Sequence, residues 1–546
     1  MPKSPFPLLV LLVGVIAVSG CTSPDATVPE EPFLFNADEV GTVDLAVSCN
    51  ESAAAKMNHG LALLHHMAYT EASLVFQTVL EEDPSCSLAH WGRAMTLIHP
   101  LWPDTPTGAE LDQGSALVEQ ALALDPKTER ERAYIDAVGA YFTDAHQREA
   151  GERRISFHQG WQNVHERFPE DLEATAFYVL SGLAADLPRT SGGALMEELI
   201  ARVPDHPAGH HYAIHAYDTP TLAPKGLEVA RAYGELTPEV PHALHMPTHI
   251  FTQLGLWSES IDLNERSVAA AWNQGQRNNA IDVSYPHALS YLIYAYLQTG
   301  QDGAAKAVWD RTAAVEGPFS ELNIMVFAAH LAEIPVLYAL DRHAWEEATQ
   351  IETRLPASFP WDERFTQFDA LAYFSQTIGY ARSGDSRAAR EALVQLQSAI
   401  VGTETPGTVS WLIWDGQALS LAAEAWVSYA EGEFERAVMT MAAAAERSAS
   451  LHDDSWKLPL PSGELLGDMY LELGRHDEAL TTYEAVLERL PNRFNSLYGA
   501  ARSAELSDRE EKAKEHYGKL IEMTIGESAR PEVERARAFL ATFSAS

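Results

Sequence analysis

The sequence feature that most constrains the fold is a short landmark that recurs down most of the chain. A turn residue is followed five places later by a small residue, and helix-favouring apolar stretches lie on both sides. Between Gly255 and Gly474 the landmark returns about every 45 residues, a period typical of repeated helix pairs. The pairs of turn and small residue are Met67 and Ala72, Gly255 and Ser260, Gly300 and Ala305, His343 and Ala348, Gly384 and Ala389, Gly432 and Ala437, Gly474 and Ala479, and Asp508 and Ala513.

The segments between these landmarks have helical periodicity. Ala, Leu, Glu and Arg recur with apolar residues at three- and four-residue spacing, and strand signals are scarce. Six prolines lie where the second helix of a pair should stop, because proline cannot continue a helix. We therefore expect an all-α fold of repeated helix pairs. The segment Glu464–Pro491 resembles the tetratricopeptide repeat, which implies a tetratricopeptide-like α-solenoid, a right-handed superhelix of helix pairs, with an ordinary helical bundle as the alternative. The prolines are Pro84, Pro126, Pro169, Pro204, Pro238 and Pro491.

The N-terminus has the pattern of a targeting signal. Lys3 precedes an apolar run over residues 6–18, which is too short to span a membrane, and small residues lead into Cys21. This pattern resembles a bacterial lipoprotein signal, which implies acylation of Cys21 and a mature chain that begins there. An ordinary secretory signal and an uncleaved anchor are the alternatives. Thr22 resembles the residue found in signals sent to the outer membrane, so we expect a lipid-anchored protein of the cell envelope, at the outer membrane and facing the periplasm.

Composition changes divide the chain into five regions. Residues 1–20 are the expected signal peptide, and residues 21–40, rich in Pro, Ser, Thr and acids, are a flexible tether. Residues 41–204 form N-terminal helical repeats, 205–310 a His-rich central set, and 311–540 C-terminal tetratricopeptide-like repeats. No later apolar run reaches the length of a membrane span, so membrane contact is expected through lipid alone.

Charge and cysteine content narrow the partners and the compartment. With 38 Lys and Arg against 77 Asp and Glu, the net charge is −39, so a nucleic acid is not an expected partner. Beyond Cys21 the chain has only Cys49 and Cys86. In the oxidising compartment that the signal implies, a disulfide between them is the simplest expectation, and two buried free thiols are the alternative.

Beyond the repeat type, the chain resembles a large bacterial family of tetratricopeptide-like proteins over about residues 41–540. The pattern HxxHMPxHIF is its most specific string, and the segment Glu464–Pro491 is the best single repeat. The resemblance implies a fold and a motif but no reaction. Its strings are VSCN at Val47, GLALLHHMAY at Gly60, DPSCSLAHWGRAM at Asp83, HPLW at His99, ERAYIDA at Glu131, HHYAIHAYD at His210, HALHMPTHIFTQLGLW at His242 and PNRFNSLYGAAR at Pro491.

Histidine is concentrated in the centre of the chain, where eight of 21 lie between His206 and His287. Pro207, Pro241 and Pro286 are each expected to open the first helix of a repeat. Residues at equal offsets from these prolines should face the same way, because first helices run side by side. We expect six imidazoles to share one wall of a concave groove, with a carboxylate beside them. They are His211, His215, His242, His245, His249 and His287, with Asp218.

This spacing suits a divalent transition metal, with zinc, iron and copper as the candidates, because imidazole binds all three. Asp205, Asp218 and Asp282 are available to orient ring N–H groups. No CxxC or HExxH pattern supports the site, so a polar groove for a peptide and purely structural histidines remain open. Pro247 is expected either to aim His245 and His249 at one point or to spoil their shared face.

Two further histidines, His65 and His99, reach the same groove only if the superhelix curls back. Tyr212, Tyr217, Phe251 and Trp257 flank the central histidines at helical spacing and are expected in the core.

Two functions follow from these residues. The first is a lipid-anchored repeat protein that binds a protein or peptide partner in a concave groove, with a His-rich metal site. The second is a metal-dependent enzyme, a hydrolase or oxidase, in which the metal acidifies a bound water and Asp218 or a spare imidazole moves the proton. Serine or cysteine nucleophile chemistry is disfavoured, because the chain has no GxSxG, P-loop or GxGxxG motif.

Overall fold

The structure is a computed structural model that describes residues 35–102, 105–185, 187–401, 415–450 and 460–544. The signal and the lipid-bearing Cys21 expected near the N-terminus lie outside these residues. All the described residues belong to one unit, residues 33–546. In the part of the chain described, no helix has both the length and the apolarity needed to cross a bilayer.

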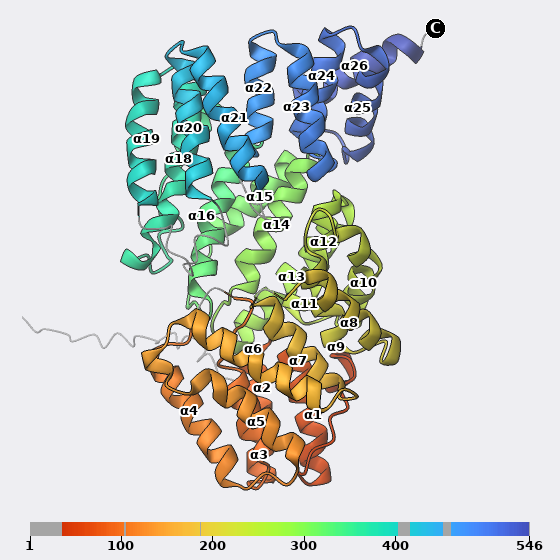
Figure 1. The fold of residues 1–546 in the computed structure, drawn as a ribbon. Coiled ribbons are helices and arrows are strands. Elements are labelled where there is room, and N and C mark those ends of the chain that lie inside the picture. Colours follow the sequence, from red (N-terminus) through yellow and green to blue (C-terminus); the bar gives the residue numbers. More distant parts are fainter. Residues whose placement is uncertain (1–34, 103–104, 186, 402–414, 451–459, 545–546) are drawn as a thin grey trace, which may run out of the picture. The chain divides into compact units, whose positions relative to one another are not determined.

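The predicted all-α class is confirmed, because helices account for nearly all the regular structure of the described residues (Figure 1). The N-terminal helices are η1 Ala37–Glu39, α1 Glu51–His65, α2 Tyr69–Glu82, α3 Ser87–Met95, α4 Gly108–Ala123, α5 Glu129–Phe142, η2 Ala145–Gln147, α6 Ala150–Arg167, α7 Leu172–Leu183 and α8 Arg189–Arg202. The central helices are α9 Pro207–Tyr217, α10 Ala223–Leu236, α11 Pro241–His245, α12 Pro247–Leu254, α13 Trp257–Asn278, α14 Ser284–Gln298 and α15 Asp302–Ala313. The C-terminal helices are α16 Ile324–Leu340, α17 Trp345–Ala348, η3 Glu363–Phe368, α18 Asp369–Arg382, α19 Ser386–Ile400, α20 Gly416–Ala430, α21 Phe434–Ser450, α22 Ser462–Glu472, α23 His476–Arg489, α24 Phe494–Leu506, α25 Glu510–Met523 and α26 Pro531–Ser544.

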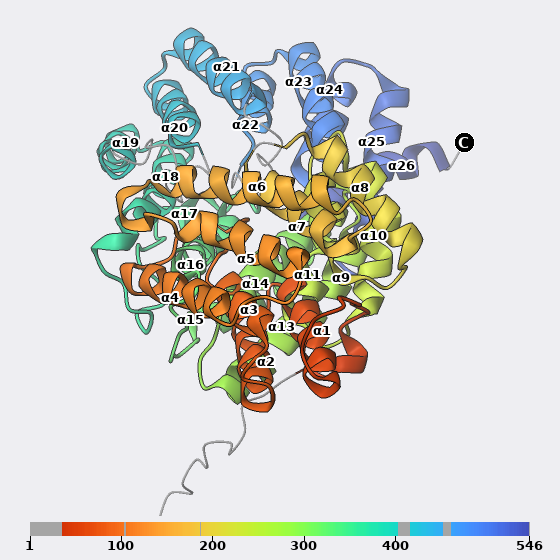
Figure 2. The same ribbon diagram turned by 60° about the horizontal axis from the view of Figure 1, so that its bottom comes forward.

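The turn residues of the recurring landmark adopt the left-handed backbone conformation that ends a helix. Gly255, for example, has φ 65° directly after α12, and its N–H bonds back to the helix. Non-glycine turn residues adopt the same conformation, with φ 58° at Met67 and 52° at His343. The chain therefore reverses direction at each landmark, and consecutive helices pack as antiparallel pairs, as α18 with α19 and α20 with α21 do (Figures 1 and 2).

Glycines let the paired helices approach closely around a large side chain. Tyr483 of α23 fills the space between Gly467 of α22 and Gly499 of α24. A Cβ atom at Gly499 would lie 2.3 Å from the Tyr483 ring, which no real contact allows. The expected close packing of small against large residues is therefore observed in this repeat.

A buried arginine connects the C-terminal repeats to the central helices. Arg493 donates to Glu464 through Nε at 2.8 Å, to Asp341 through Nη2 at 2.6 Å, and to the Tyr294 hydroxyl at 2.8 Å. Burial raises the pKa of Asp341 to about 6, although Arg493 opposes the shift. In the N-terminal repeats, a disulfide joins Cys49 and Cys86, whose Cα atoms are 5.0 Å apart.

Prolines shape the central repeats. Pro207 and Pro241 are the first residues of α9 and α11, as expected, whereas α14 begins at Ser284, two residues before Pro286. Pro247 divides the HALHMPTHIF segment into α11 and α12, which meet at Met246. Helices α9, α11, α12 and α14 therefore carry the six histidines of the expected site.

Candidate metal centre

The six central histidines gather into two groups of three. His211, His215 and His242 form a first triad, and His245, His249 and His287 form a second. Within each triad, one ring nitrogen from every residue lies within 4.8 Å of the others. Each triad therefore has the number and type of ligands found in catalytic zinc sites.

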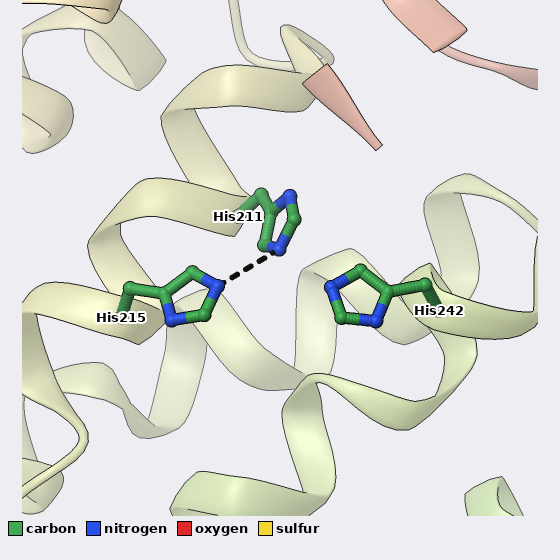
Figure 3. Close-up of side chains that lie close together, drawn as sticks. All are labelled: His211, His215 and His242. Carbon is green, nitrogen blue, oxygen red and sulfur yellow. Dashed lines mark hydrogen bonds between the residues drawn. The ribbon is translucent and has the colours of Figure 1, made fainter. Parts of the chain in front are cut away.

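The first triad is formed by residues of α9 and α11, which α10 separates in the sequence. His211 and His215 lie one turn apart on α9, and His242 of α11 faces them (Figure 3). The Nε2 atoms of His211 and His215 are 3.1 Å apart. His211 donates its Nδ1–H to the carbonyl oxygen of His65 at 2.5 Å, so its Nε2 carries the lone pair when the ring is neutral.

The second triad is assembled across the Pro247 break. His245 ends α11, His249 lies in α12, and their Nε2 atoms are 3.0 Å apart. His287 comes from α14, with its ring centroid 4.1 Å from that of His245. The break therefore aims the two rings at one point, which is the first of the two outcomes expected for Pro247.

Hydrogen bonds fix the tautomers of the second triad. The Asn264 amide donates its Nδ2–H to the Ser260 carbonyl at 2.9 Å, which turns Oδ1 toward His245 Nδ1, 2.8 Å away. The Asp218 carboxylate accepts from His249 Nδ1 at 2.7 Å. Since both Nδ1 atoms carry a proton, neutral rings present two Nε2 lone pairs to each other.

A cation between these two nitrogens would turn their repulsion into attraction. Two nitrogens bound to one tetrahedral zinc ion at about 2.0–2.1 Å lie about 3.3 Å apart. The observed separations of 3.0 Å in the second triad and 3.1 Å in the first are close to that value. The spacing of the rings is therefore compatible with two ligands of one metal ion.

The protonation equilibria also favour neutral rings in the first triad. Burial, followed by the charge of neighbouring histidines, lowers the pKa of His211, His215 and His242 well below its usual range. The pKa of Asp218 is lowered, because the His249 and Gln253 donors outweigh the effect of burial. Neutral imidazole beside an ionised carboxylate is the state that binds a transition metal.

The two triads interact with each other. Charge on His245 or His249 contributes to the lowered pKa of His242, and charge on His249 to that of His215. The indole of Trp102 contacts both triads, with centroid distances of 5.5 Å to His242 and 5.9 Å to His287. The two triads therefore lie next to each other in the fold.

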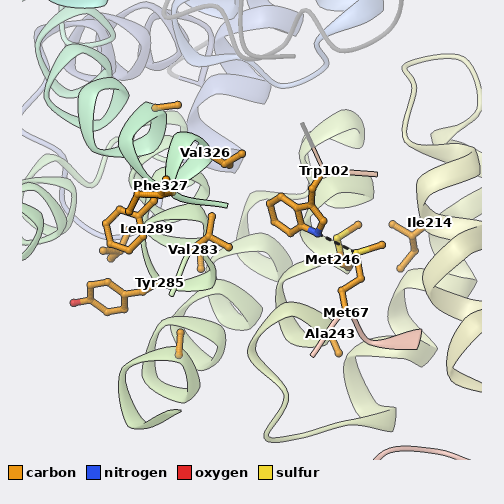
Figure 4. Close-up of a cluster of buried hydrophobic side chains, with 14 of the residues drawn as sticks. Met67, Trp102, Ile214, Ala243, Met246, Val283, Tyr285, Leu289, Val326 and Phe327 are labelled. Atoms are coloured by element: carbon orange, nitrogen blue, oxygen red, sulfur yellow. Dashed lines mark hydrogen bonds between the residues drawn. The ribbon is translucent and has the colours of Figure 1, made fainter. Parts of the chain in front are cut away.

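The expectation that these rings line an open groove is wrong. Five of the six are buried and His215 is half-buried. Trp102, in the HPLW string, packs against His242 and His287, and its indole N–H donates to the Met67 sulfur at 3.2 Å (Figure 4). Tyr291 of α14 packs against the second triad from another side, with centroids 4.6 Å from His245 and 4.7 Å from His249.

The carboxylates expected near the site have different roles. Asp218 accepts a hydrogen bond from His249 of the second triad and so orients that ring. It is not one of the residues grouped as possible ligands. Asp205 accepts from the Thr42 hydroxyl at 2.5 Å and belongs to neither triad. Asp282 lines a small cavity next to His242.

Sequence reasoning missed a third cluster. Glu173 of α7 accepts from His65 Nε2 at 2.6 Å and from His206 Nε2 at 2.7 Å. Burial raises the pKa of Glu173, but the charges of His65 and His206, followed by these two bonds, outweigh it and lower the pKa. Because the His65 carbonyl also anchors His211, this cluster supports the first triad. Of the two distant histidines, His65 therefore contacts the site, whereas His99 packs against Tyr69, with centroids 4.4 Å apart.

The expected core aromatics are buried beside these groups. The side chains of Tyr212 and Tyr217 are at most 2% exposed, and Phe251 and Trp257 are also buried. Asn264 and Tyr291 were not expected at the site. The sequence signal available for Asn264 was its helical spacing from two other polar residues, four places after Ser260 and three before Ser267.

A match to a known protein family agrees with the repeat type over one helix pair. The tetratricopeptide repeat family matches residues 465–493, which are α22, α23 and the turn after them. No curated protein matches the chain. Solved structures similar to it include a monomeric mutant of IFIT1 with Gppp-AAAA, 12% identical over 80% of this chain and 90% of that chain, with TM-score 0.37. The human IFIT1 dimer with m7Gppp-AAAA is 12% identical over 81% of this chain and 90% of that chain, with TM-score 0.36.

The helix pairs, their left-handed turns and the matched repeat define the class. The protein is an all-α, tetratricopeptide-like helical repeat protein.

Proposed function

We propose that this protein is a lipid-anchored repeat protein of the cell envelope whose central repeats bind two transition metal ions, one in each triad. The observation that carries the proposal is the pair of Nε2 atoms of His245 and His249, which face each other at 3.0 Å with both Nδ1 protons already donated. Mutual repulsion of two lone pairs in a buried site is costly, and a bound cation removes it.

The ligand chemistry narrows the choice of ion. Both triads consist of imidazole alone, which suits zinc, copper and iron, whereas manganese, magnesium and calcium prefer carboxylates. In the third cluster both carboxylate oxygens of Glu173 already accept ring N–H groups, so we propose no ion there. Copper and zinc are the favoured occupants of the triads, since copper binds such sites most tightly and zinc accepts three imidazoles and a water.

A metal-dependent enzyme is the second candidate. Three protein ligands leave a coordination position open, as in catalytic zinc sites, and a metal supplies an acidified water there. Asp218 holds the His249 ring, and the Tyr291 hydroxyl lies 3.1 Å from His249 Nδ1. These two groups would keep the ring in the tautomer that binds metal while a proton moves at the open position.

Anchoring and partner binding complete the proposal. Cys21 carries the lipid, and a protein or peptide partner docks on the helix pairs, as the fold class permits. The partner contacts at most His215 of the triads, because the other five rings are buried. Intact-mass measurement of membrane-extracted protein tests the anchor: acylation adds the mass of a lipid to a chain beginning at Cys21, and a Cys21→Ser variant remains unmodified. An unmodified N-terminus at another residue would reject the anchor alone.

Metal analysis tests the centre. Protein produced without an affinity His tag should contain about two ions of zinc or copper per chain, and His249→Ala should lose at least one without loss of helicity. His146→Ala is the matched control, because that histidine is exposed and bonded only to Asp112. If removing the metal with a chelator lowers the melting temperature of the protein, the metal has a structural role. If the melting temperature is unchanged and a coordination position of the metal is open, the result favours the metal-dependent enzyme.

A further inference from the structure

A small cavity leads to the first triad. It has a volume of about 30 Å³, enough for one or two water molecules, and both exposed Thr70 and buried His242 line it. His242 is 6% exposed, and neither ring nitrogen has a hydrogen-bond partner. The cavity therefore connects the surface near Thr70 with an imidazole that is open to a ligand.

Two carboxylates lie along the same cavity. Glu71 is 2% exposed and accepts from the Gln274 and Asn278 amides at 2.7 and 2.9 Å. Asp282 accepts from the Ser284 N–H at 2.9 Å. Burial and then the charge of Glu71 raise the pKa of Asp282 to about 6, so both groups repel each other at neutral pH. A cation between them would relieve that repulsion.

The other imidazole on the cavity wall is already engaged. His66 bonds to the Tyr233 hydroxyl through Nδ1 at 2.7 Å and to the Val40 carbonyl through Nε2 at 2.9 Å. An ion in the cavity therefore finds carboxylate oxygens first and the His242 ring next, with no competing nitrogen at His66.

We propose that this cavity is the route by which a metal ion reaches the first triad, with Glu71 and Asp282 holding the incoming cation before it passes to His242. The proposal rests on the proposed metal centre. It also implies that only ions and molecules of about the size of water reach the first triad by this route. The carboxylates raise the local cation concentration, and the imidazoles then retain the ion because they suit zinc and copper better than oxygen ligands do.

Metal-loading kinetics test the route. Apo protein is mixed with Zn²⁺ or Cu²⁺, and uptake is followed in the wild type, Glu71→Gln, Asp282→Asn and the double variant. Gln and Asn keep the acceptor oxygens, so the local hydrogen bonds can persist. The control is the double variant Glu259→Gln with Asp262→Asn, which removes the same charge from the surface of α13.

We expect the Glu71 and Asp282 double variant to load one of its two ions about tenfold more slowly than the control, with the same final metal content. Uptake by all variants at the control rate, with full final content, would overturn the route and leave the metal centre standing. Absence of metal from the fully loaded wild type would overturn the centre itself. Circular dichroism checks that each variant retains its helices. If the double variant loses them, the two single variants are compared with the wild type instead.

Discussion

His245 and His249 face each other through Nε2 at 3.0 Å, while Asn264 and Asp218 accept their Nδ1 protons. One acceptor comes from α13 and the other from the end of α9, so two neighbouring helices set the orientation of these rings. The proposed metal centre rests on this relationship between the two rings.

Removing the charge behind His249 should weaken the second site. Asp218→Asn keeps an acceptor oxygen but loses the carboxylate that makes the ring a better ligand, so we expect metal affinity at that site to fall by about 10- to 100-fold. Competition with a chromophoric chelator measures the change. The exposed Asp310→Asn is the control and should have unchanged affinity; an unchanged affinity in Asp218→Asn would show that this carboxylate does not support a ligand.

The two triads should lose their ions separately. Alanine at His215 removes a ligand of the first triad, and alanine at His287 removes one of the second. Each variant should retain about one ion per chain, and the double variant about none, because two imidazoles hold an ion far less tightly than three. Metal analysis after dialysis gives the content. Loss of both ions from either single variant would indicate that the sites do not fill independently.

The buried Arg493 should contribute strongly to stability. Arg493→Ala leaves Glu464 and Asp341 buried without their shared cation, so we expect the free energy of unfolding to fall by about 3–5 kcal/mol. Urea denaturation measures the loss. Arg475→Ala, which breaks the partly exposed pair with Glu478, should cost no more than about 1 kcal/mol, and equal losses in the two variants would refute the distinction.

Acid should destabilise the metal-free protein through His66. Burial lowers its pKa from 6.5 to about 3 in the folded protein, so above pH 6.5 the ring is neutral whether the chain is folded or unfolded. Below pH 6.5 only the unfolded chain takes up the proton, and stability is lost until the pH reaches about 3. Between pH 7 and 5 this group costs about 2 kcal/mol. His66→Gln should therefore have a shallower loss in urea unfolding over that interval; an identical loss would contradict the shift.

Local rules were enough to predict the repeat architecture. Gly300 and Gly474 were predicted as turn residues because a reversal after a helix favours the left-handed conformation, and both adopt it. His343 also lies at a landmark position and has φ 52°, although it lacks the conformational freedom of glycine. A turn of this kind depends on residues that are neighbours in sequence, so it can be predicted from the sequence.

The site could be predicted only in part. Offsets from Pro207, Pro241 and Pro286 identified the six histidines because facing depends on helical periodicity, although α14 begins two residues before Pro286. The division into triads depends on how α9, α11 and α14 cross, so His242 joins His211 and His215 although it lies beside His245 in sequence. Burial by Trp102 arises from a contact between distant repeats, which no local pattern reveals.

Anomalous diffraction from crystals of the untagged, metal-loaded protein tests the central claim most directly. We predict two peaks at the absorption edge of zinc or copper, each about 2.0–2.2 Å from nitrogens of one triad, first His211, His215 and His242, then His245, His249 and His287. Absence of anomalous density at both triads in crystals of saturated protein, or density only beside Glu173, would contradict the account.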